Sequence, residues 1–198
     1  MKIGSLFSGY GGLDLAVAEY FDAEVVWHCE WEKAPSTILE RNFPGVPNFH
    51  DVSKVNFAEV EPVDILTGGF PCQDLSLAGK RAGLTEGTRS GLWSEFARAI
   101  ETIRPRMVVI ENVRGLLSAT AHGSVEQCAW CMGETNGEPV LRALGAVLGD
   151  LADLGYGFGW RVMDARYFGV PHRRRRVVLV GHLGGTGATS GEILFEPE

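Results

Sequence analysis

The hydrophobic pattern of the chain alternates between short runs rich in Val, Ile and Leu and longer stretches with apolar residues three or four positions apart. The short runs are typical of buried strands, and the longer stretches are typical of amphipathic helices. We predict strands over Lys2–Phe7, Glu24–His28, Val63–Thr67, Met107–Ile110, Phe158–Met163 and Arg176–Val180. We predict helices over Leu13–Phe21, Glu32–Asn42, Leu92–Ile103 and Pro139–Leu154, and Gly-rich loops over Gly68–Gly91 and Gly181–Gly191.

This alternation predicts an α/β fold, an open and mostly parallel sheet with helices on both faces. We expect a single domain over residues 1–198, because this length falls in the usual range for one domain. Ligands of such sheets bind beyond the carboxyl ends of the strands. The residues that follow each strand are therefore the candidates for function.

Composition excludes two classes of protein and complicates a third. Hydrophobic residues make up 45% of the chain and charged residues 22%, so neither a disordered nor a membrane protein is expected. The net charge of −7 disfavours a broadly basic nucleic-acid-binding surface. The charge is uneven, however: residues 1–159 carry 12 Lys and Arg against 21 Asp and Glu, and residues 160–198 carry 6 against 4. The consecutive arginines Arg173–Arg176 therefore predict a local contact with an anion.

The cysteines indicate a reducing compartment. The N-terminus has no signal-peptide pattern, and four cysteines without one do not form a disulfide framework, so we expect a cytoplasmic protein with reduced thiols. Cys128 and Cys131 form a lone C-x-x-C with only His122 nearby; we interpret them as exposed thiols and predict no metal site. Cys29 is interpreted as a small core residue. Ordinary packed or surface positions are expected for His28, His50 and His182.

Three segments in the first half of the chain could contact a nucleotide. Phe7-Ser8-Gly9-Tyr10-Gly11-Gly12 follows the first strand, and its glycines would let a ligand approach the backbone; an ordinary tight turn explains them equally well. Glu30-Trp31 follows the second strand, where an acid can bind a ribose and an indole can cover a purine, although a surface Glu beside a half-buried Trp is the simpler alternative. Asp51 is a third candidate, or a loop acid.

The later strands deliver residues suited to catalysis. Cys72 lies in the loop after the third predicted strand, behind two glycines and a proline, where a thiolate could act as a nucleophile. Glu111-Asn112-Val113 follows the next strand, so its carboxylate could face Cys72 at the rim of the sheet. The arginine run enters an apolar strand, and alternation would place Arg174 and Arg176 on one face and the other two on the opposite face.

Taken together, these motifs resemble the cytosine-C5 DNA methyltransferase family over nearly the whole chain. The resemblance implies a Rossmann-like S-adenosylmethionine-dependent methyltransferase fold with Cys72, Glu111, Arg174 and Arg176 as catalytic residues. It also implies a cofactor site built from Phe7, Gly9, Gly11, Gly12, Glu30, Trp31, Asp51, Val52, Pro71 and Leu92. One departure is visible, because His172 stands where the family usually has Gln.

The resemblance further implies a mechanism. The Cys72 thiolate would add to C6 of a flipped-out cytosine, Glu111 would donate toward N3, and Arg176 with Arg174 would hold the O2 side. The Gly68–Gly91 loop would close over the base. Substrate contacts are expected from Gln73, Ser76, Lys80, Arg81 and Asn112, and a phosphate contact from Arg89.

The family usually continues into a target-recognition domain, and we find no such region here, so base readout has no evident carrier. A truncated product, one half of a split enzyme completed by a second chain, and a remnant that only binds cofactor all fit this length. We therefore expect the chain alone to be weakly active or inactive. An RNA (tRNA) cytosine-C5 methyltransferase shares the catalytic layout and remains an alternative to DNA. A non-catalytic binding module would not require Cys72, Glu111 and Arg176 together.

Overall fold

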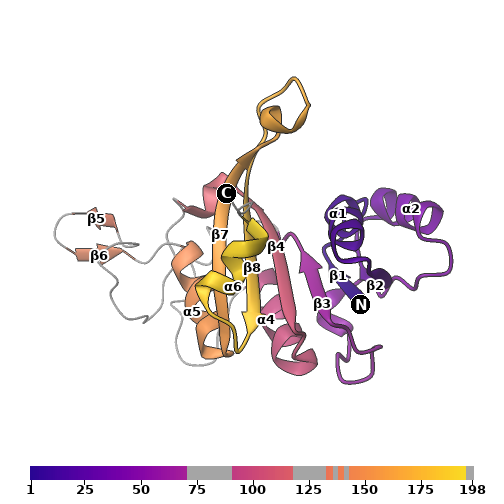
Figure 1. Cartoon of the computed structure of the whole chain (residues 1–198). Helices are drawn as coiled ribbons and strands as arrows, with labels where there is room; N and C mark the ends of the chain where they lie inside the picture. Colours follow the sequence, from indigo (N-terminus) through magenta and orange to yellow (C-terminus); the bar gives the residue numbers. More distant parts are fainter. Residues whose placement is uncertain (71–90, 118–132, 136–137, 141–142, 195–198) are drawn as a thin grey trace.

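The computed structural model of the chain describes residues 1–70, 91–117, 133–135, 138–140 and 143–194. Its centre is a six-stranded sheet in the order β2-β1-β3-β4-β8-β7 (Figure 1). Neighbours among β1 to β4 pair in parallel, whereas β8 runs antiparallel to both β4 and β7. The predicted mostly parallel sheet is therefore confirmed. Its strands are β1 Lys2–Leu6, β2 Glu24–Cys29, β3 Ile65–Gly68, β4 Met107–Val113, β7 Tyr156–Asp164 and β8 Arg175–Leu183.

Helices cover both faces of the sheet, as predicted. One apolar core joins α4 and α5 to one face, with Phe96 and Leu151 fully buried in it. A second core joins α1 and α6 to the other face, where Val17 and Leu194 pack near Ile65. The helices are α1 Gly12–Phe21, α2 Lys33–Asn42, α4 Leu92–Ile103, α5 Ala143–Asp153 and α6 Gly187–Leu194. The short elements are the 3₁₀ turns η1 Val52–Lys54, η2 Arg114–Leu117 and η3 Ala165–Phe168, and the strands β5 Gly133–Thr135 and β6 Glu138–Val140.

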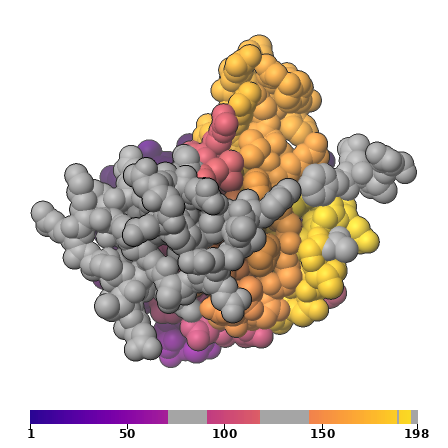
Figure 2. Space-filling model, turned by 90° about the vertical axis from the view of Figure 1, so that its left-hand side faces the viewer, coloured from indigo at the N-terminus to yellow at the C-terminus, as the bar shows by residue number. Residues whose placement is uncertain are grey.

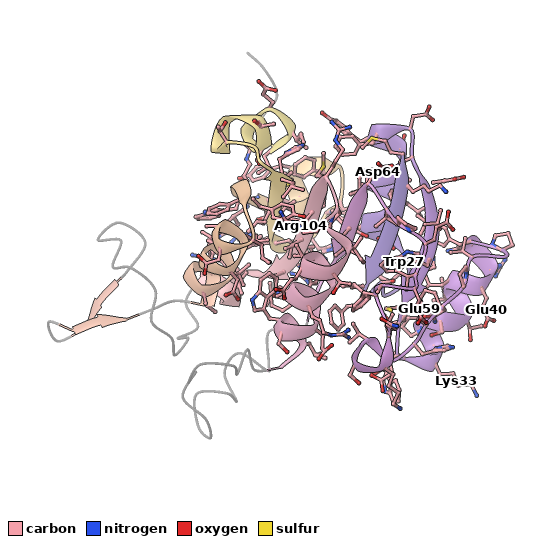
Figure 3. All side chains as sticks on the ribbon, turned by 90° about the horizontal axis from the view of Figure 1, so that it is seen from below. Trp27, Lys33, Glu40, Glu59, Asp64 and Arg104 are labelled. Atoms are coloured by element: carbon pink, nitrogen blue, oxygen red, sulfur yellow. The ribbon has the colours of Figure 1, made fainter. Side chains whose placement is uncertain are left out.

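Trp27 fixes the packing of β2 against β1. Its indole is 1% exposed and covers Gly4, where an added Cβ would lie 2.1 Å from a ring carbon. The indole N–H donates to the carbonyl of Glu61 at 2.9 Å, so the buried polar atom is satisfied. Seen from below, Trp27 lies inside the molecule, whereas Lys33 and Glu40 of α2 lie at its periphery (Figure 3).

The prediction of a loop over Gly181–Gly191 was wrong. Gly181 belongs to β8, and residues 187–194 form α6. The glycines serve close packing instead of flexibility: a Cβ on Gly181 would lie 2.8 Å from a methyl group of Val108, and one on Gly157 of β7 would lie 2.1 Å from the carbonyl oxygen of Gly185. Composition alone does not separate these two uses of glycine.

Two predicted boundaries also shift. The helix predicted over Pro139–Leu154 begins at Ala143, because Pro139 lies in β6 and pairs with Glu134 of β5. Proline is tolerated in such a strand, which has only one partner. The strand predicted over Met107–Ile110 continues to Val113, because Glu111 to Val113 pair with β8. The candidate acid therefore stands on a strand, which holds it more rigidly than a loop would.

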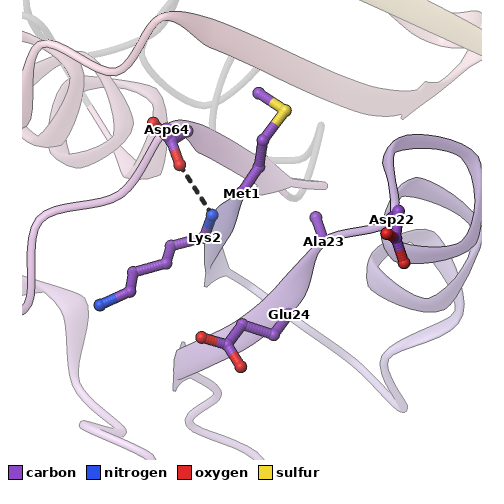
Figure 4. Close-up of a pocket in the computed structure, with 6 residues that line it drawn as sticks. All are labelled: Met1, Lys2, Asp22, Ala23, Glu24 and Asp64. Carbon is purple, nitrogen blue, oxygen red and sulfur yellow. Dashed lines mark hydrogen bonds between the residues drawn. The ribbon is translucent and has the colours of Figure 1, made fainter.

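One pocket lies at the amino ends of β1 and β2, away from the residues that follow the strands. It has a volume of about 500 Å³, and the backbone N–H of Lys2 donates to Asp64 Oδ2 at 2.8 Å beside it (Figure 4). Its location makes it a poor candidate for the site that the motifs predict. Within the described ranges, no helix has the length and apolarity needed to cross a bilayer. The described side chains also contain no group of three or more His, Cys, Asp or Glu able to hold a metal.

Candidate functional site

The turn between β1 and α1 presents bare backbone at the carboxyl end of β1. Phe7, Gly9 and Gly11 have φ angles of 54°, 56° and 83°, and the first turn of α1 follows directly. A Cβ on Gly11 would lie 2.6 Å from the ring of Phe43, so this position requires glycine. Apart from Gly9 itself and its two chain neighbours, no described residue has an atom within 4 Å of the Cβ position of Gly9. The turn therefore offers open space and the N-terminus of α1 to a ligand.

Glu30 is brought to this turn as predicted. The side chain is 7% exposed, with Oε2 accepting from the Gly9 N–H and Oε1 from the Glu32 N–H, both at 2.7 Å. Each carboxylate oxygen has a further lone pair, so a sugar hydroxyl could still donate to it. Trp31 next to it is 69% exposed and has a free face for stacking. The turn, the acid and the indole are thus adjacent.

Asp51 and Val52 follow β2 in the chain, and both have structural roles in the fold. The Asp51 carboxylate caps η1, accepting from the Ser53 N–H at 3.1 Å and from its hydroxyl at 2.7 Å. The hydrogen bond from the Ser53 side chain and the nearby Lys54 hold the pKa of Asp51 below its usual value. Val52 is buried in the larger core, and Leu92 packs against that core at the start of α4. Their contacts with a cofactor stay a prediction.

The second group of candidates surrounds Glu111 on β4. Nε of Arg176 lies 2.6 Å from Glu111 Oε1, and both side chains are partly exposed. A Cβ on Gly69 would lie 3.2 Å from Glu111 Oε2, so this carboxylate lies beside the start of the Gly68–Gly91 segment. We call Gly68–Gly91, which contains Cys72, the cysteine segment. Its start therefore meets an acid and a guanidinium at the ends of β3, β4 and β8.

Asn112 holds the base of the same segment. The side chain is 4% exposed, and its amide donates to the carbonyl of Phe70 at 2.9 Å. Its Oδ1 accepts from the Val113 N–H at 2.8 Å, so the amide of Asn112 is bonded on both sides. Phe70 is buried between Trp93 and Phe96 of α4. The backbone leading into Pro71-Cys72 is thus anchored from two directions.

The arginine run divides between the two faces of the sheet. Arg176 meets Glu111 on one face, while Nε of Arg175 lies 3.3 Å from Asp164 Oδ2 on the other, so the predicted alternation is seen for these two. The Arg174 side chain is exposed, and the backbone N–H of Arg174 donates to Asp164 Oδ1 at 3.2 Å. Of the two predicted catalytic arginines, the structure therefore brings Arg176 to the acid.

Several predicted residues lie outside the described part of the chain. They comprise the nucleophile and most of the substrate contacts, with the C-x-x-C pair and its neighbouring histidine: Pro71, Cys72, Gln73, Ser76, Lys80, Arg81, Arg89, His122, Cys128 and Cys131. Their predicted roles stay predictions.

Asp14 is a buried acid under the glycine turn that the sequence analysis missed. The Ser5 hydroxyl donates to its Oδ2 at 2.8 Å and the Thr67 hydroxyl to its Oδ1 at 2.6 Å, which links α1 to β1 and β3. Burial raises the pKa of Asp14 to about 6, against the effect of both hydroxyls. His28 lies close, with Nδ1 3.7 Å from Asp14, and burial lowers its pKa to about 4. The sequence does contain a signal for this site, because Asp14 is an acidic residue on the otherwise apolar face of the predicted helix.

Asp14→Asn is expected to stabilise the protein above pH 6 by about 3 kcal/mol, because the fold favours the protonated acid. The stabilising effect of the raised pKa is complete below the unfolded value of 3.8 and is lost as the pH rises through about 6. The advantage of the variant should therefore vanish near pH 4. Urea unfolding at pH 4 and pH 8 measures it.

Asp22→Asn is the matched control for this prediction. Asp22 is the exposed C-cap of the same helix, and its φ of 49° suits Asn. Its effect on stability should be small and alike at both pH values. An Asp14→Asn variant that is no more stable than the parent at pH 8 would contradict the assignment.

A family model described as "C-5 cytosine-specific DNA methylase" matches residues 1–194. Among curated proteins, Type II methyltransferase M2.BsuMI of Bacillus subtilis (strain 168) is 34% identical over 187 residues, which cover 92% of this chain and 42% of the relative. Type II methyltransferase M.HhaI of Haemophilus parahaemolyticus is 33% identical over 180 residues, covering 91% and 48%. The chain spans about half the length of the curated relatives that it matches.

Solved structures share the fold. The crystal structure of S. pombe Dnmt2 methyltransferase superimposes with a TM-score of 0.70 at 18% identity, covering 94% of this chain and 52% of that one. A putative DNA modification methyltransferase encoded within an E. coli prophage gives a TM-score of 0.64 at 23% identity, covering 92% and 47%. These structures support the Rossmann-like methyltransferase fold predicted from the sequence.

Proposed function

The chain belongs to the C-5 cytosine-specific DNA methylase family, and we propose that its protein transfers a methyl group from S-adenosylmethionine to C5 of cytosine in DNA. The observation that carries this proposal is the ion pair of Glu111 with Arg176 next to Gly69, where the segment that contains Cys72 begins. This arrangement supplies an acid and a cation beside the start of the segment that contains Cys72, and addition of a thiolate to a pyrimidine ring requires these groups.

The glycine turn fits the cofactor. Gly9 leaves space beside the N-terminus of α1, Glu30 has lone pairs for ribose hydroxyls, and the exposed Trp31 can cover adenine. We assign the remaining cofactor contacts to Phe7, Asp51, Val52, Pro71 and Leu92 with Gly11 and Gly12. When bound, the cofactor supplies a sulfonium methyl group as the electrophile. The anchoring of Glu30 by two N–H groups would keep its carboxylate oriented.

In the proposed mechanism, the Cys72 thiolate adds to C6 of the cytosine and C5 becomes nucleophilic. Glu111 donates a proton or hydrogen bond to N3, so charge does not accumulate on the ring. Arg176 binds at O2 while it pairs with Glu111, with Arg174 beside it. C5 would take the methyl group and leave the thioether form of the cofactor behind. The C5 proton is then lost to a base, the thiolate is expelled from C6, and a proton taken up by N3 returns to Glu111, which restores both the aromatic ring and the enzyme.

We propose DNA as the partner on the chemistry of the surface near this rim. A groove of about 480 Å³ is lined by Arg114, Arg161 and Arg175 together with the aromatic rings of Tyr167 and Phe168. Guanidinium groups suit phosphates, and exposed rings suit bases, so the overall acidity of the chain does not prevent a local contact. Target recognition is assigned to a further region or to a second chain. A DNA substrate and a reduced thiol nucleophile also favour the cytoplasm of a prokaryotic cell.

Covalent trapping on DNA that contains 5-fluorocytosine tests this function. The fluorine blocks loss of the group at C5, so an adduct with Cys72 should accumulate in the presence of S-adenosylmethionine and resist denaturing electrophoresis. Matched RNA and 5-methylcytosine duplexes serve as the other arms. Trapping on RNA alone would support an RNA cytosine methyltransferase instead. A lack of adduct on either, even after addition of a candidate second chain for target recognition, would overturn the proposal.

A further inference from the structure

Asp164 closes the neck of the hairpin between β7 and β8, which is the point where the two strands end and residues 165–174 begin. It is the last residue of β7 and 7% exposed. Its Oδ1 accepts from the N–H groups of Arg166 at 3.4 Å and Arg174 at 3.2 Å, one on each side of the hairpin. The Ala165 N–H also donates to the carbonyl of Arg174 at 3.0 Å. One carboxylate thus ties together the two ends of residues 165–174, which project beyond the sheet (Figures 1 and 2).

The neck sets which arginine faces the acid on β4. Asp164 pairs with Arg175 across the strands, and Arg176 pairs with Met163 on one side and Val113 on the other. Side chains alternate along a strand, so a slip of one residue would turn Arg176 away from Glu111 and bring Arg175 to its face. The placement of Arg176 therefore depends on a register that begins at Asp164.

Repulsion among the arginines would favour a shift in the register of β8. Asp164 can oppose this shift because it binds two of these arginines. Arg166 and Arg173–Arg176 are five like charges within eleven residues of sequence. Among the described residues, the carboxylates that contact them are Asp164 on one face and Glu111 on the other. Burial by itself would raise the pKa of Asp164, but the N–H groups of Arg166 and Arg174 and the Arg175 guanidinium hold it below its usual value. Asp164 therefore stays charged at neutral pH and engages Arg175.

We propose that Asp164 is a positioning residue: it fixes the register of the arginine segment so that Arg176, and not Arg175, meets Glu111. Its effect on catalysis rests on the proposed function, whereas its effect on Arg176 does not. A carboxylate that served only to brace the hairpin would influence stability and leave the Arg176 to Glu111 contact unchanged. The two roles are therefore separable by observing Arg176 directly.

The test compares Asp164→Ala with Asp164→Asn. Asn keeps Oδ1 as the acceptor for both backbone N–H groups but removes the charge, and Ala removes both. Arg175→Gln is the matched control, because it breaks the outer ion pair and leaves the neck intact. In the ¹⁵N-labelled chain, the Nε–Hε signal of Arg176, assigned with Arg176→Lys, reports the contact with Glu111. Urea unfolding measures stability alongside.

We expect Asp164→Ala to move the Arg176 signal to the position of a solvated arginine, and Asp164→Asn and Arg175→Gln to retain it. Loss in both Asp164 variants would assign the positioning to the charge and also support the proposal. If the alanine variant does not fold, Asp164→Thr replaces it, since one hydroxyl can serve only one of the two N–H groups. An unchanged Arg176 signal in a folded Ala or Thr variant would overturn the proposal.

The rate of adduct formation provides the second readout. Displacing a catalytic group by about 1 Å can cost about 100-fold, so we expect Asp164→Ala to slow trapping by about 10- to 100-fold without weakening cofactor binding. If no adduct forms, even after addition of a second chain that supplies target recognition, the proposed function fails while the NMR signal still decides the role of Asp164. If the parent reacts and Asp164→Ala reacts equally fast, the positioning role fails and the function stands.

Discussion

Cys72→Ser is expected to slow adduct formation on 5-fluorocytosine DNA by about 1000-fold or more, which would leave no adduct visible on a gel. The reason is chemical: a serine hydroxyl is almost entirely protonated at neutral pH, and its oxygen adds to the ring far more slowly than a thiolate. Binding of S-adenosylmethionine, measured by calorimetry, should not change, because the glycine turn and Glu30 are untouched.

Cys29→Ala is the control for this experiment. Cys29 is buried at the end of β2, and burial raises its pKa to about 12, so it carries no thiolate at neutral pH and cannot replace the nucleophile. The variant should trap DNA within about twofold of the parent, since an inert thiol contributes only packing. Persistence of the adduct in Cys72→Ser, or its loss from a folded Cys29→Ala, would show that the wrong thiol has been assigned.

Glu111→Gln is expected to slow adduct formation by about 100- to 1000-fold, the usual contribution of a positioned general acid. The amide has the shape of the carboxyl group and can still bond to Arg176, but its N–H is too weak an acid to transfer a proton to N3. DNA binding and cofactor binding should therefore stay near those of the parent. Single-turnover trapping, measured against time, separates this slower addition from weaker binding.

Glu95→Gln gives the matched control, because Glu95 also lies 2.6 Å from an arginine, Arg98, but on α4. Removing that pair should change stability slightly and leave the trapping rate unchanged. Equal slowing in both variants would attribute the effect to loss of a Glu–Arg pair in general. An unaffected rate in Glu111→Gln would remove this residue from the catalytic group.

Local features were predictable from the sequence, and contacts between distant segments were not. The strand and helix pattern follows from apolar periodicity, and the turn at Gly9 and Gly11 follows from glycines at a strand end. Nothing local indicates that the Asn112 amide bonds to Phe70, 42 positions earlier. Asp164 gives no signal either, because its partners depend on how β7 and β8 pair.

The last helix shows a different reason for failure. The stretch that contains α6 is rich in glycine, and glycine in a sequence favours a loop on average. Here the glycines allow β7, β8 and the start of α6 to approach one another closely, as Gly157 and Gly185 show. Close packing and flexibility leave the same trace in a sequence, so only the three-dimensional arrangement distinguishes them.

The antiparallel insertion of β8 has a consequence for how the protein is made. Strands β1 to β4 can pair as soon as they leave the ribosome, but β8 enters between β4 and β7 only after residues 175–183 have been synthesised. Until then the free edge of β4 is open to pairing with other nascent chains, a common cause of aggregation. Until then Glu111 also lacks its ion pair with Arg176. The acid and its arginine are therefore joined late in biosynthesis, and we expect the nascent protein to gain its reactive site only then.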